Sequence, residues 1–140
     1  MREATVKGIL ADVNIQGHVE RLTSLMESEP WREFWEDLHL DYASFDDVGL
    51  PHDAPDADVW HLCQELGYVL ITRNRNQDGP DSLEATIRAQ NTAESLPVLT
   101  IADSERLLHG REYADRVVES LLEILMQIDA LRGTGRLYLP

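Results

Sequence analysis

The sequence predicts an α/β fold, a three-layer sandwich in which helices cover both faces of a central parallel sheet of four to five strands. Two observations lead to this prediction. Strand-like and helix-like segments alternate along the chain, and the strand-like segments are continuous apolar runs, which is typical of parallel strands buried on both faces. The 140 residues suit one domain, residues 1–140, since no repeat, low-complexity tract or second boundary interrupts the alternation.

In the first half of the chain, the spacing of apolar residues predicts two strands and three helices. TVKGILADV is a buried run, and apolar residues recur at helical spacing after it. PWREFWEDL places Trp31, Phe34 and Trp35 on one side of a short helix. Pro55 closes the loop before the next helix, which Gly67 ends. In order, these elements are a strand over about Val6–Asp12, a helix from about Asn14, a short helix over 30–38, a strand over 39–45 and a helix over 56–66.

The second half predicts three more strands, the last of them small. YVLIT is the clearest strand, and the helix after it has Asp81 as N-cap with Glu84 three residues on. Asp103 caps a short helix after the strand LPVLTI. The last helix is long, and its apolar residues lie on one face from Tyr113 to Ile128. In order, these elements are a strand over 68–72, a helix over 82–90, a strand over 96–101, a short helix over 104–110, a helix from about Glu112 to Leu131 and an edge strand over 136–140.

The charge balance argues against a general nucleic-acid binder. The chain has 12 basic and 26 acidic residues, a net charge of −14, which has the wrong sign for that class. Between Glu27 and Trp60, eleven acids and one base give this segment a net charge of −10. Such a block is typical of a solvated face, and the alternatives are a cation site or a surface for a basic partner.

Two further features bear on the compartment. No apolar run approaches the length of a membrane helix, and the start of the chain has no cleavage pattern, so we expect a cytoplasmic protein that does not enter a membrane. The one cysteine, Cys63, excludes an internal disulfide and predicts a buried structural thiol.

Polar side chains follow the predicted strands, where ligands bind in open parallel sheets. We expect right-handed crossovers to bring these loops to one edge. Carboxylates that converge there repel one another unless a cation neutralises them, and Mg²⁺ suits such oxygen ligands. A metal held there could clamp a phosphate and activate water. The polar residues are Asp12, Asp46 and Asp47, Asn74, Asn76 and Asp78, and Asp103, with Asp56 and Asp58 opening the helix before the third strand.

Several of these acids also have a structural interpretation. Asp56 and Asp58 are good first-turn acids, and Asp81 and Asp103 are good helix caps. Asp12 has no such explanation, because nothing at the end of a buried strand requires a charge. We therefore expect Asp12 to be the best functional candidate.

Three segments, LADVN, VGLPHDAPDADVW and LGYVLITRNRN, resemble a PIN-like domain. The resemblance is closest to the short bacterial kind related to toxin ribonucleases of toxin–antitoxin pairs, and it spans about Ile9 to Asn76. In that family an aspartate ends the first strand, which matches Asp12. An acid opens the helix before the third strand in the pattern D-x-x-aliphatic, which matches Asp56 with Val59, and Asp58 is a near alternative.

The resemblance implies a metal-dependent nuclease, a hydrolase of RNA phosphodiesters, with Mg²⁺ or Mn²⁺ as cofactor. The chain departs from the family after its third strand, where T-x-D-x-D-like acids are usual and this sequence has asparagines at 74 and 76. An amide oxygen can ligate Mg²⁺ without adding negative charge, so we expect weakened metal binding. The implied catalytic residues are Asp12, Asp56 and Asn74; the metal ligands are Asp12, Asp56, Asp58 and Asp78; and the phosphate-binding residues are Arg73, Arg75 and Asn76.

Two functions remain open. The first is a PIN-like ribonuclease that acts on RNA and pairs with an antitoxin. The second is a noncatalytic PIN-like interaction module, a homodimer or a binder of a protein partner, which the net charge and the asparagines favour. A phosphoacceptor receiver domain also begins with an apolar strand ending in an aspartate. That function needs a lysine at the end of its last strand, and the only lysine, Lys7, lies inside the first.

Overall fold

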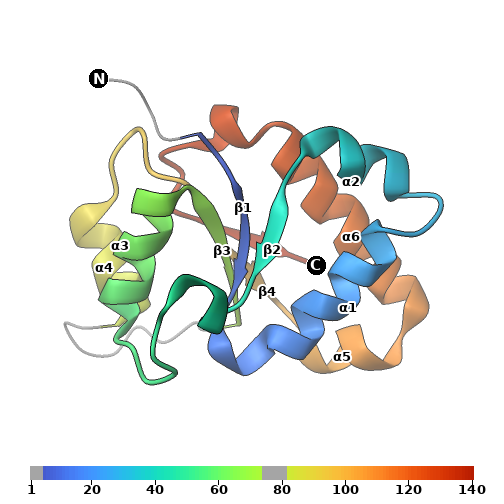
Figure 1. Cartoon of the computed structure of the whole chain (residues 1–140), viewed down its shortest axis with the longest axis horizontal. Helices are drawn as coiled ribbons and strands as arrows, with labels where there is room; N and C mark the ends of the chain where they lie inside the picture. Colours follow the sequence, from blue (N-terminus) through green and yellow to red (C-terminus); the bar gives the residue numbers. More distant parts are fainter. Residues whose placement is uncertain (1–4, 74–81) are drawn as a thin grey trace.

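The computed structural model describes residues 5–73 and 82–140, which form five parallel strands in one sheet. The predicted α/β class is therefore confirmed, with the larger of the two expected strand numbers. In Figure 1 the sheet is seen edge-on, with β2 towards the viewer. The strands are β1 (Gly8–Ala11), β2 (Asp41–Ala43), β3 (Tyr68–Thr72), β4 (Val98–Ile101) and β5 (Arg136–Leu139), in the spatial order β2-β1-β3-β4-β5.

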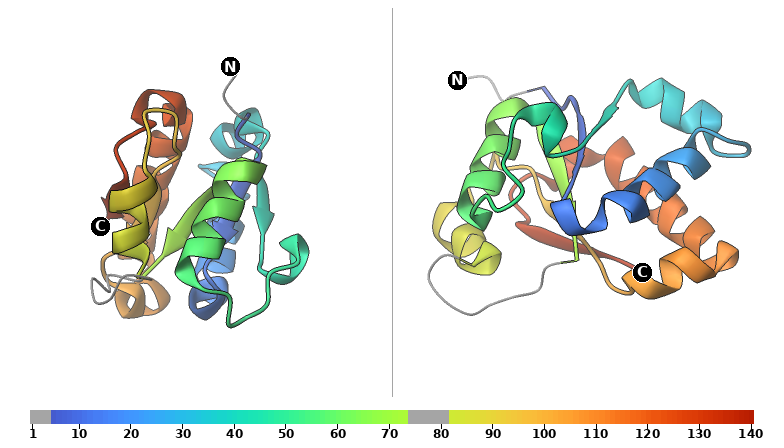
Figure 2. Two further views of the ribbon diagram at one scale, coloured as in Figure 1. Left: turned by 90° about the vertical axis from the view of Figure 1, so that its left-hand side faces the viewer. Right: turned by 60° about the horizontal axis from the view of Figure 1, so that its bottom comes forward.

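Helices cover both faces of this sheet, which completes three layers (Figures 1 and 2). On one face lie α1 (Gln16–Met26), α2 (Arg32–Leu38), α5 (Ser104–His109) and α6 (Arg111–Met126), and on the other lie α3 (Asp56–Leu66) and α4 (Leu83–Gln90). Short 3-10 turns η1 (Val13–Ile15), η2 (Asp46–Val48) and η3 (Ile128–Leu131) join some of them. None of the helices within the described ranges is long and apolar enough to cross a membrane.

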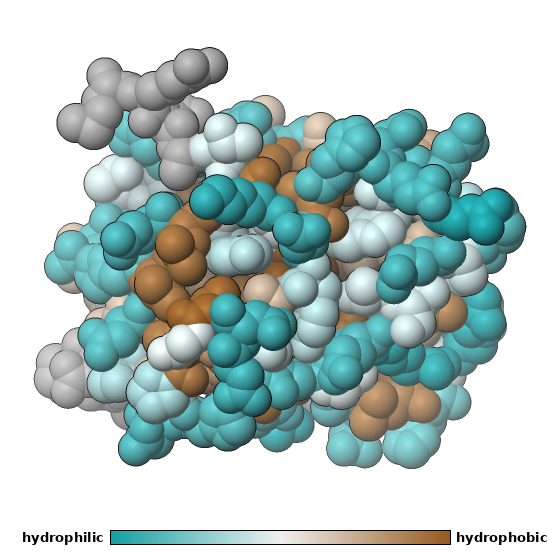
Figure 3. Space-filling model, in the orientation of Figure 1, coloured by the Kyte–Doolittle hydropathy of each residue, from teal (hydrophilic) through white to brown (hydrophobic). Residues whose placement is uncertain are grey.

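Successive residues of a strand point to opposite faces of the sheet and belong to two separate hydrophobic cores. Ile9 and Val69 point to the α1 and α6 side, whereas their neighbours Leu10 and Leu70 pack with α3 and α4. Because both faces are buried, every residue of β1 and β4 must be small or apolar or have its polar group satisfied, which explains the unbroken apolar runs. Hydrophobic residues reach the surface mainly left of centre in Figure 3, beside the β2 edge, and most of that face is hydrophilic.

One connection departs from the expected handedness. The chain moves from β2 to β3 and from β3 to β4 in one direction across the sheet with α3 and α4 on one face. It continues in the same direction from β4 to β5, but α5 and α6 lie on the opposite face. This last connection therefore has the opposite hand to the others, and parallel crossovers are right-handed in almost all sheets. The prediction of uniform right-handed crossovers is wrong here because α6 packs against α1 and α2.

Two glycines are required by close backbone approaches. Gly8 pairs with Asp41 in the β1–β2 ladder, and a Cβ built on it would lie 2.1 Å from the Asp41 carbonyl oxygen. Gly67 ends α3 with a φ of +86°, as predicted, and a Cβ there would lie 2.3 Å from the Thr5 carbonyl oxygen. Both contacts lie at the end of the sheet where the strands begin, and they hold the start of β1 against β2 and against the end of α3.

A side chain substitutes for a strand partner at the entrance to β4. The Gln64 amide nitrogen on α3 donates to the Leu96 carbonyl oxygen at 3.0 Å, and the Leu96 N–H donates to the Gln64 Oε1 at 2.8 Å. Both polar groups of the Leu96 backbone are satisfied in this way, although Leu96 itself is buried in the core. The segment that enters β4 is thereby attached to α3.

Three details of the predicted elements need correction. The N-cap of α4 is Ser82, whose Oγ accepts the Ala85 N–H, and not the preceding Asp81. The last long helix ends at Met126, and a separate 3-10 turn carries the chain to Leu131. Phe34 does not join Trp35 in the core, since its side chain is 49% exposed. The small edge strand at the end of the chain is confirmed as β5.

Candidate functional site

The two central strands end where the direction of the chain across the sheet reverses. β1 connects to β2 on one side, and the chain then returns to β3 on the other side of β1. In open α/β sheets, such a switch point at the carboxyl ends of the strands is where ligands bind. Asp12 follows β1 and Thr72 ends β3, so both residues lie at this switch point.

Asp12 is held from three directions. Its N–H donates to the Ile71 carbonyl oxygen at 2.9 Å, which extends the β1–β3 ladder by one bond. The Asp12 Oδ1 accepts the Val13 N–H at 2.8 Å and caps the η1 turn. The Asp12 Oδ2 accepts the Thr72 hydroxyl at 2.6 Å. The structure therefore gives Asp12 a capping role that the residues around it in the sequence do not indicate, and these bonds fix the orientation of the carboxylate.

The surroundings of Asp12 raise the pKa of its carboxyl group. Burial raises the pKa of the Asp12 carboxyl above its ordinary value, and it is the largest influence. The hydrogen bonds from Thr72 and Val13 act in the opposite direction, as does the charge of Arg73. The negative charge of Asp56 raises the pKa further, so the two carboxylates are close enough to repel each other. A cation beside them would relieve both the burial penalty and the repulsion.

Asp56 is the first residue of α3 and connects two helices. The N-cap of α3 is Pro55, which has no side chain to satisfy the first helical N–H groups. The Asp56 side chain caps a different helix: its Oδ2 accepts the Leu83 N–H at the start of α4, at 3.1 Å. Asp58, the alternative acid of the sequence analysis, is exposed in the same turn. The structure thus ties Asp56 to the α4 N-terminus and brings its charge to Asp12.

Two further residues, Arg73 and His18, are linked electrostatically to the Asp12 site. Arg73 is a predicted site residue, and His18 is not. Arg73 is exposed directly after β3, and its charge acts on Asp12 and on His18. Burial lowers the pKa of His18 from its ordinary value and Arg73 lowers it further, while Glu105 opposes them. The His18 Nε2 is buried without a hydrogen-bond partner in the described part of the chain. No spacing in the sequence marks His18, because its neighbours come from β3 and α5.

The remaining acids of the predicted cluster have local partners. Asp47 accepts the N–H and the hydroxyl of Ser44. Asp46 lies 3.0 Å from the His52 ring nitrogen. Asp103 caps α5 by accepting the Arg106 N–H at 3.1 Å, as predicted. These acids stabilise turns and a helix start.

Four predicted site residues, Asn74, Arg75, Asn76 and Asp78, lie outside the described residues. Within residues 5–73 and 82–140, no three His, Cys, Asp or Glu side chains gather into a group that could hold a metal. Asp12 and Asp56 supply carboxylate oxygens, and Mg²⁺ is often bound by one or two carboxylates with water completing its shell. The chemistry of this pair therefore fits Mg²⁺ or Mn²⁺.

Cys63 is buried, as predicted, and takes no reactive form. Burial raises the pKa of its thiol to about 12, and the charge of Asp12 adds to the effect. A thiol with so high a pKa stays protonated at neutral pH and is a poor nucleophile. Cys63 is a core residue of the α3 layer.

Comparisons of the chain with family models, with curated proteins and with solved structures find no match. The geometry of the site and the resemblance carried by the sequence motifs therefore remain as the support for a function.

Proposed function

We propose that the chain is a Mg²⁺- or Mn²⁺-dependent ribonuclease of the PIN-like kind. The observation that carries the proposal is the oriented, partly buried carboxylate of Asp12 at the switch point, with the charge of Asp56 raising its pKa. A fold gains no stability from two carboxylates that repel each other in a partly buried place, and perturbed carboxyl groups of this kind gather at functional sites.

In this proposal Asp12 and Asp56 hold the cation through their carboxylate oxygens. When bound, the cation would neutralise both carboxylates, clamp an RNA phosphate and lower the pKa of a water molecule. Thr72 and Val13 keep the Asp12 carboxylate in one orientation. Arg73, exposed beside the pair, would bind a phosphate oxygen through its guanidinium group.

The same features predict a slow enzyme. The net charge of −14 repels RNA everywhere except near local positive charge such as that of Arg73. The asparagines at positions 74 and 76, where the family usually has acids, reduce the negative charge available to a cation. We expect metal affinity and turnover to be correspondingly low.

A noncatalytic interaction module on the same fold is the second candidate. The acidic balance of the chain favours it, and so does the presence of large apolar side chains on the surface, such as Phe34 and Met126. Such a module would bind a protein partner, or a second copy of the chain as a homodimer, and it would leave Asp12 with only its capping role.

Cleavage of a labelled single-stranded RNA in the presence of Mn²⁺ separates the two candidates. We expect slow cleavage by the wild type, cleavage at the same rate by the exposed control Glu65→Gln, and none by Asp12→Asn. Equal cleavage by Asp12→Asn and the wild type would indicate a contaminating nuclease. Absence of cleavage by all three proteins would favour the interaction module.

Thermal melting tests the metal site without a substrate. Mn²⁺ at a hundredfold excess over its Kd should stabilise the wild type by about 2.7 kcal/mol, a rise in Tm of roughly 5–10 °C for a domain of this size. Glu65→Gln should gain as much, and Asp12→Asn little. If neither the wild type nor Asp12→Asn responds to Mn²⁺, Asp12 is a structural acid and the ribonuclease proposal loses its central residue.

A further inference from the structure

A small apolar groove lies between α2 and the second half of α6, away from Asp12. Its volume is about 210 Å³, which gives room for one large apolar side chain. Met126 ends α6, and this half of the helix lies near the end of the sheet where the strands begin, opposite to the switch point (Figure 1). The residues that line the groove are Trp31, Phe34, Glu119, Leu122, Glu123 and Met126.

The groove gathers exposed apolar surface that the fold itself does not cover. Phe34 is 49% exposed and Met126 52% exposed, and they are two of the four large apolar side chains that stand out on the described surface. Leu122, which is 2% exposed, belongs to the core beneath them. Scattered apolar residues need no explanation, but two that line one groove above a core leucine are typical of an interaction surface.

A hydrogen-bond donor without a partner among the described residues is a second feature of this groove. Trp31 lines the groove, and its indole N–H is buried with no partner in the described part of the chain. Buried indole N–H groups are usually hydrogen-bonded. Because this nitrogen is not exposed, an oxygen of a bound chain would accept its hydrogen bond only after the Trp31 side chain turns outward.

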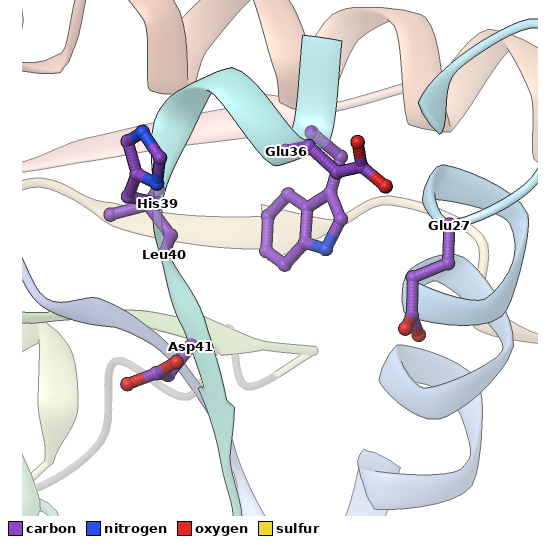
Figure 4. A pocket seen from close by; sticks show the side chains of 6 residues that line it. Glu27, Glu36, His39, Leu40 and Asp41 are labelled. Atoms are coloured by element: carbon purple, nitrogen blue, oxygen red, sulfur yellow. The ribbon is translucent and has the colours of Figure 1, made fainter. Parts of the chain in front are cut away.

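The charges around the groove are negative. Glu119 and Glu123 are four residues apart on α6 and both line it. On the other side of α2 lies a second hollow of about 400 Å³, where the side chains of Glu27 and Glu36 occupy different sides of the space and Asp41 lies at the start of β2 (Figure 4). The short helix α2 is thus flanked by acid-lined hollows.

These charges limit what can cover the groove. A second copy of the chain would bring its own −14 against the same acids, so self-association is disfavoured. Anionic lipid surfaces and nucleic acids are repelled in the same way. A partner with basic residues is attracted, and two acids one helical turn apart match two bases one turn apart on a facing helix.

We propose that the α2–α6 groove binds a basic amphipathic helix of another protein. The helix inserts one large apolar side chain between Phe34 and Met126, and its Lys or Arg residues pair with Glu119 and Glu123. This inference is independent of the ribonuclease proposal, because none of the groove residues belongs to the Asp12 site.

The test uses synthetic helical peptides of about four turns and the methyl signals of the methionines. The first, the Lys peptide, carries a central Leu with two Lys four residues apart beside it. The second, the Glu peptide, has Glu in place of both Lys. The third has Ser in place of the central Leu. Met126 reports on the groove, and Met26, which is fully buried in the core, serves as the internal reference. We expect the Lys peptide alone to shift the Met126 methyl signal saturably, with no change at Met26.

Variants locate the binding. Phe34→Ser should weaken binding of the Lys peptide about tenfold, whereas Leu108→Ser, another exposed apolar residue, should leave it unchanged. Glu119→Gln with Glu123→Gln should weaken it and remove most of its salt dependence. The proposal is overturned if the Glu peptide binds equally well or if no peptide shifts Met126 at millimolar concentration. It is also overturned if Met126 shifts with protein concentration alone while sedimentation shows a dimer.

Discussion

At the scale of single residues, the carboxylate of Asp12 makes structural hydrogen bonds and carries a charge that burial penalises. This carboxylate joins the ends of the two central strands through Thr72 and caps the turn that follows β1. The same burial that makes these bonds strong also penalises the charge. The balance between the two determines how stability depends on pH.

The raised pKa of Asp12 predicts that Asp12→Asn stabilises the fold at neutral pH. An acid whose folded pKa lies above its unfolded value of about 3.9 binds more protons in the folded state between those two values. The free energy of unfolding therefore falls as pH rises through this window, and the penalty is complete above it. Asparagine removes this penalty, keeps an oxygen for the Val13 N–H, and can donate its amide N–H to the Thr72 hydroxyl, since a hydroxyl also accepts.

Melting curves from pH 4 to pH 8 check this prediction. Asp12→Asn should melt higher than the wild type at pH 7, and the difference should narrow towards pH 4. Each kcal/mol corresponds to about 2–4 °C at this chain length. Glu65→Gln controls for the general loss of one negative charge. A variant that melts lower at pH 7 would mean that the hydrogen bonds to the carboxylate outweigh its burial.

The candidate site could be predicted only in part at this scale. Asp12 stands out in the sequence because it follows an apolar run, and Asp56 because it opens a helix. Their partners could not be predicted, since Thr72 is 60 residues from Asp12 and Leu83 is 27 residues from Asp56. Nothing local in the sequence encodes contacts at such separations.

At the scale of elements, the attachment of β4 to α3 depends on one side chain. Gln64 supplies both a donor and an acceptor to the backbone of Leu96. Only an amide does so with this geometry, and a shorter side chain leaves a buried N–H and C=O without partners.

Gln64→Ala should therefore destabilise the fold by about 2 kcal/mol, measured by urea unfolding. Its exposed neighbour Glu65→Ala should stay within about 0.5 kcal/mol of the wild type. Gln64→Glu keeps the acceptor and loses the donor, so its cost should diminish as the pH falls and the new carboxyl group is protonated. An effect of Gln64→Ala no larger than that of Glu65→Ala would show that water replaces the amide.

Elements with a strong periodic signal were predictable, and their ends were less so. The apolar run YVLIT gives β3 with its observed bounds because it is buried along nearly its whole length. The α4 cap is displaced by one residue because Asp81 and Ser82 have similar capping chemistry and the position of the backbone decides between them. Phe34 fits the apolar side of a helix by spacing, but α6 covers only part of α2.

At the scale of the whole molecule, the parallel sheet followed from the alternation of elements, but the opposite hand of the last connection did not. Hydrophobic periodicity shows that α6 has an apolar face, and it does not show which layer receives that face. The residues of α6 join the core of α1 and α2, and this packing determines the side on which the chain passes.

This arrangement predicts that β5 forms late in folding. β5 pairs only with β4, and residues 102–135 must be placed before it can do so, which makes its contacts costly in loop entropy. Leu139→Ala should mainly accelerate unfolding, with φ near 0, whereas Val69→Ala in the central β3 should slow folding. Both side chains are buried, so both changes should be large enough for chevron analysis. A φ-value for Leu139 equal to that for Val69 would contradict this order.

The close approach at Gly8 has a consequence for how this chain can diverge over evolutionary time. With a Cβ at position 8 only 2.1 Å from the Asp41 carbonyl oxygen, every substitution there separates β1 from β2, so selection for the fold alone retains glycine. Gly17, with no atom within 4 Å of an added Cβ, is free to drift. In descendants of this sequence, a retained glycine at position 8 therefore indicates only that the β1–β2 pairing is still present. The residue four positions later, Asp12, would record whether the proposed cation site was kept.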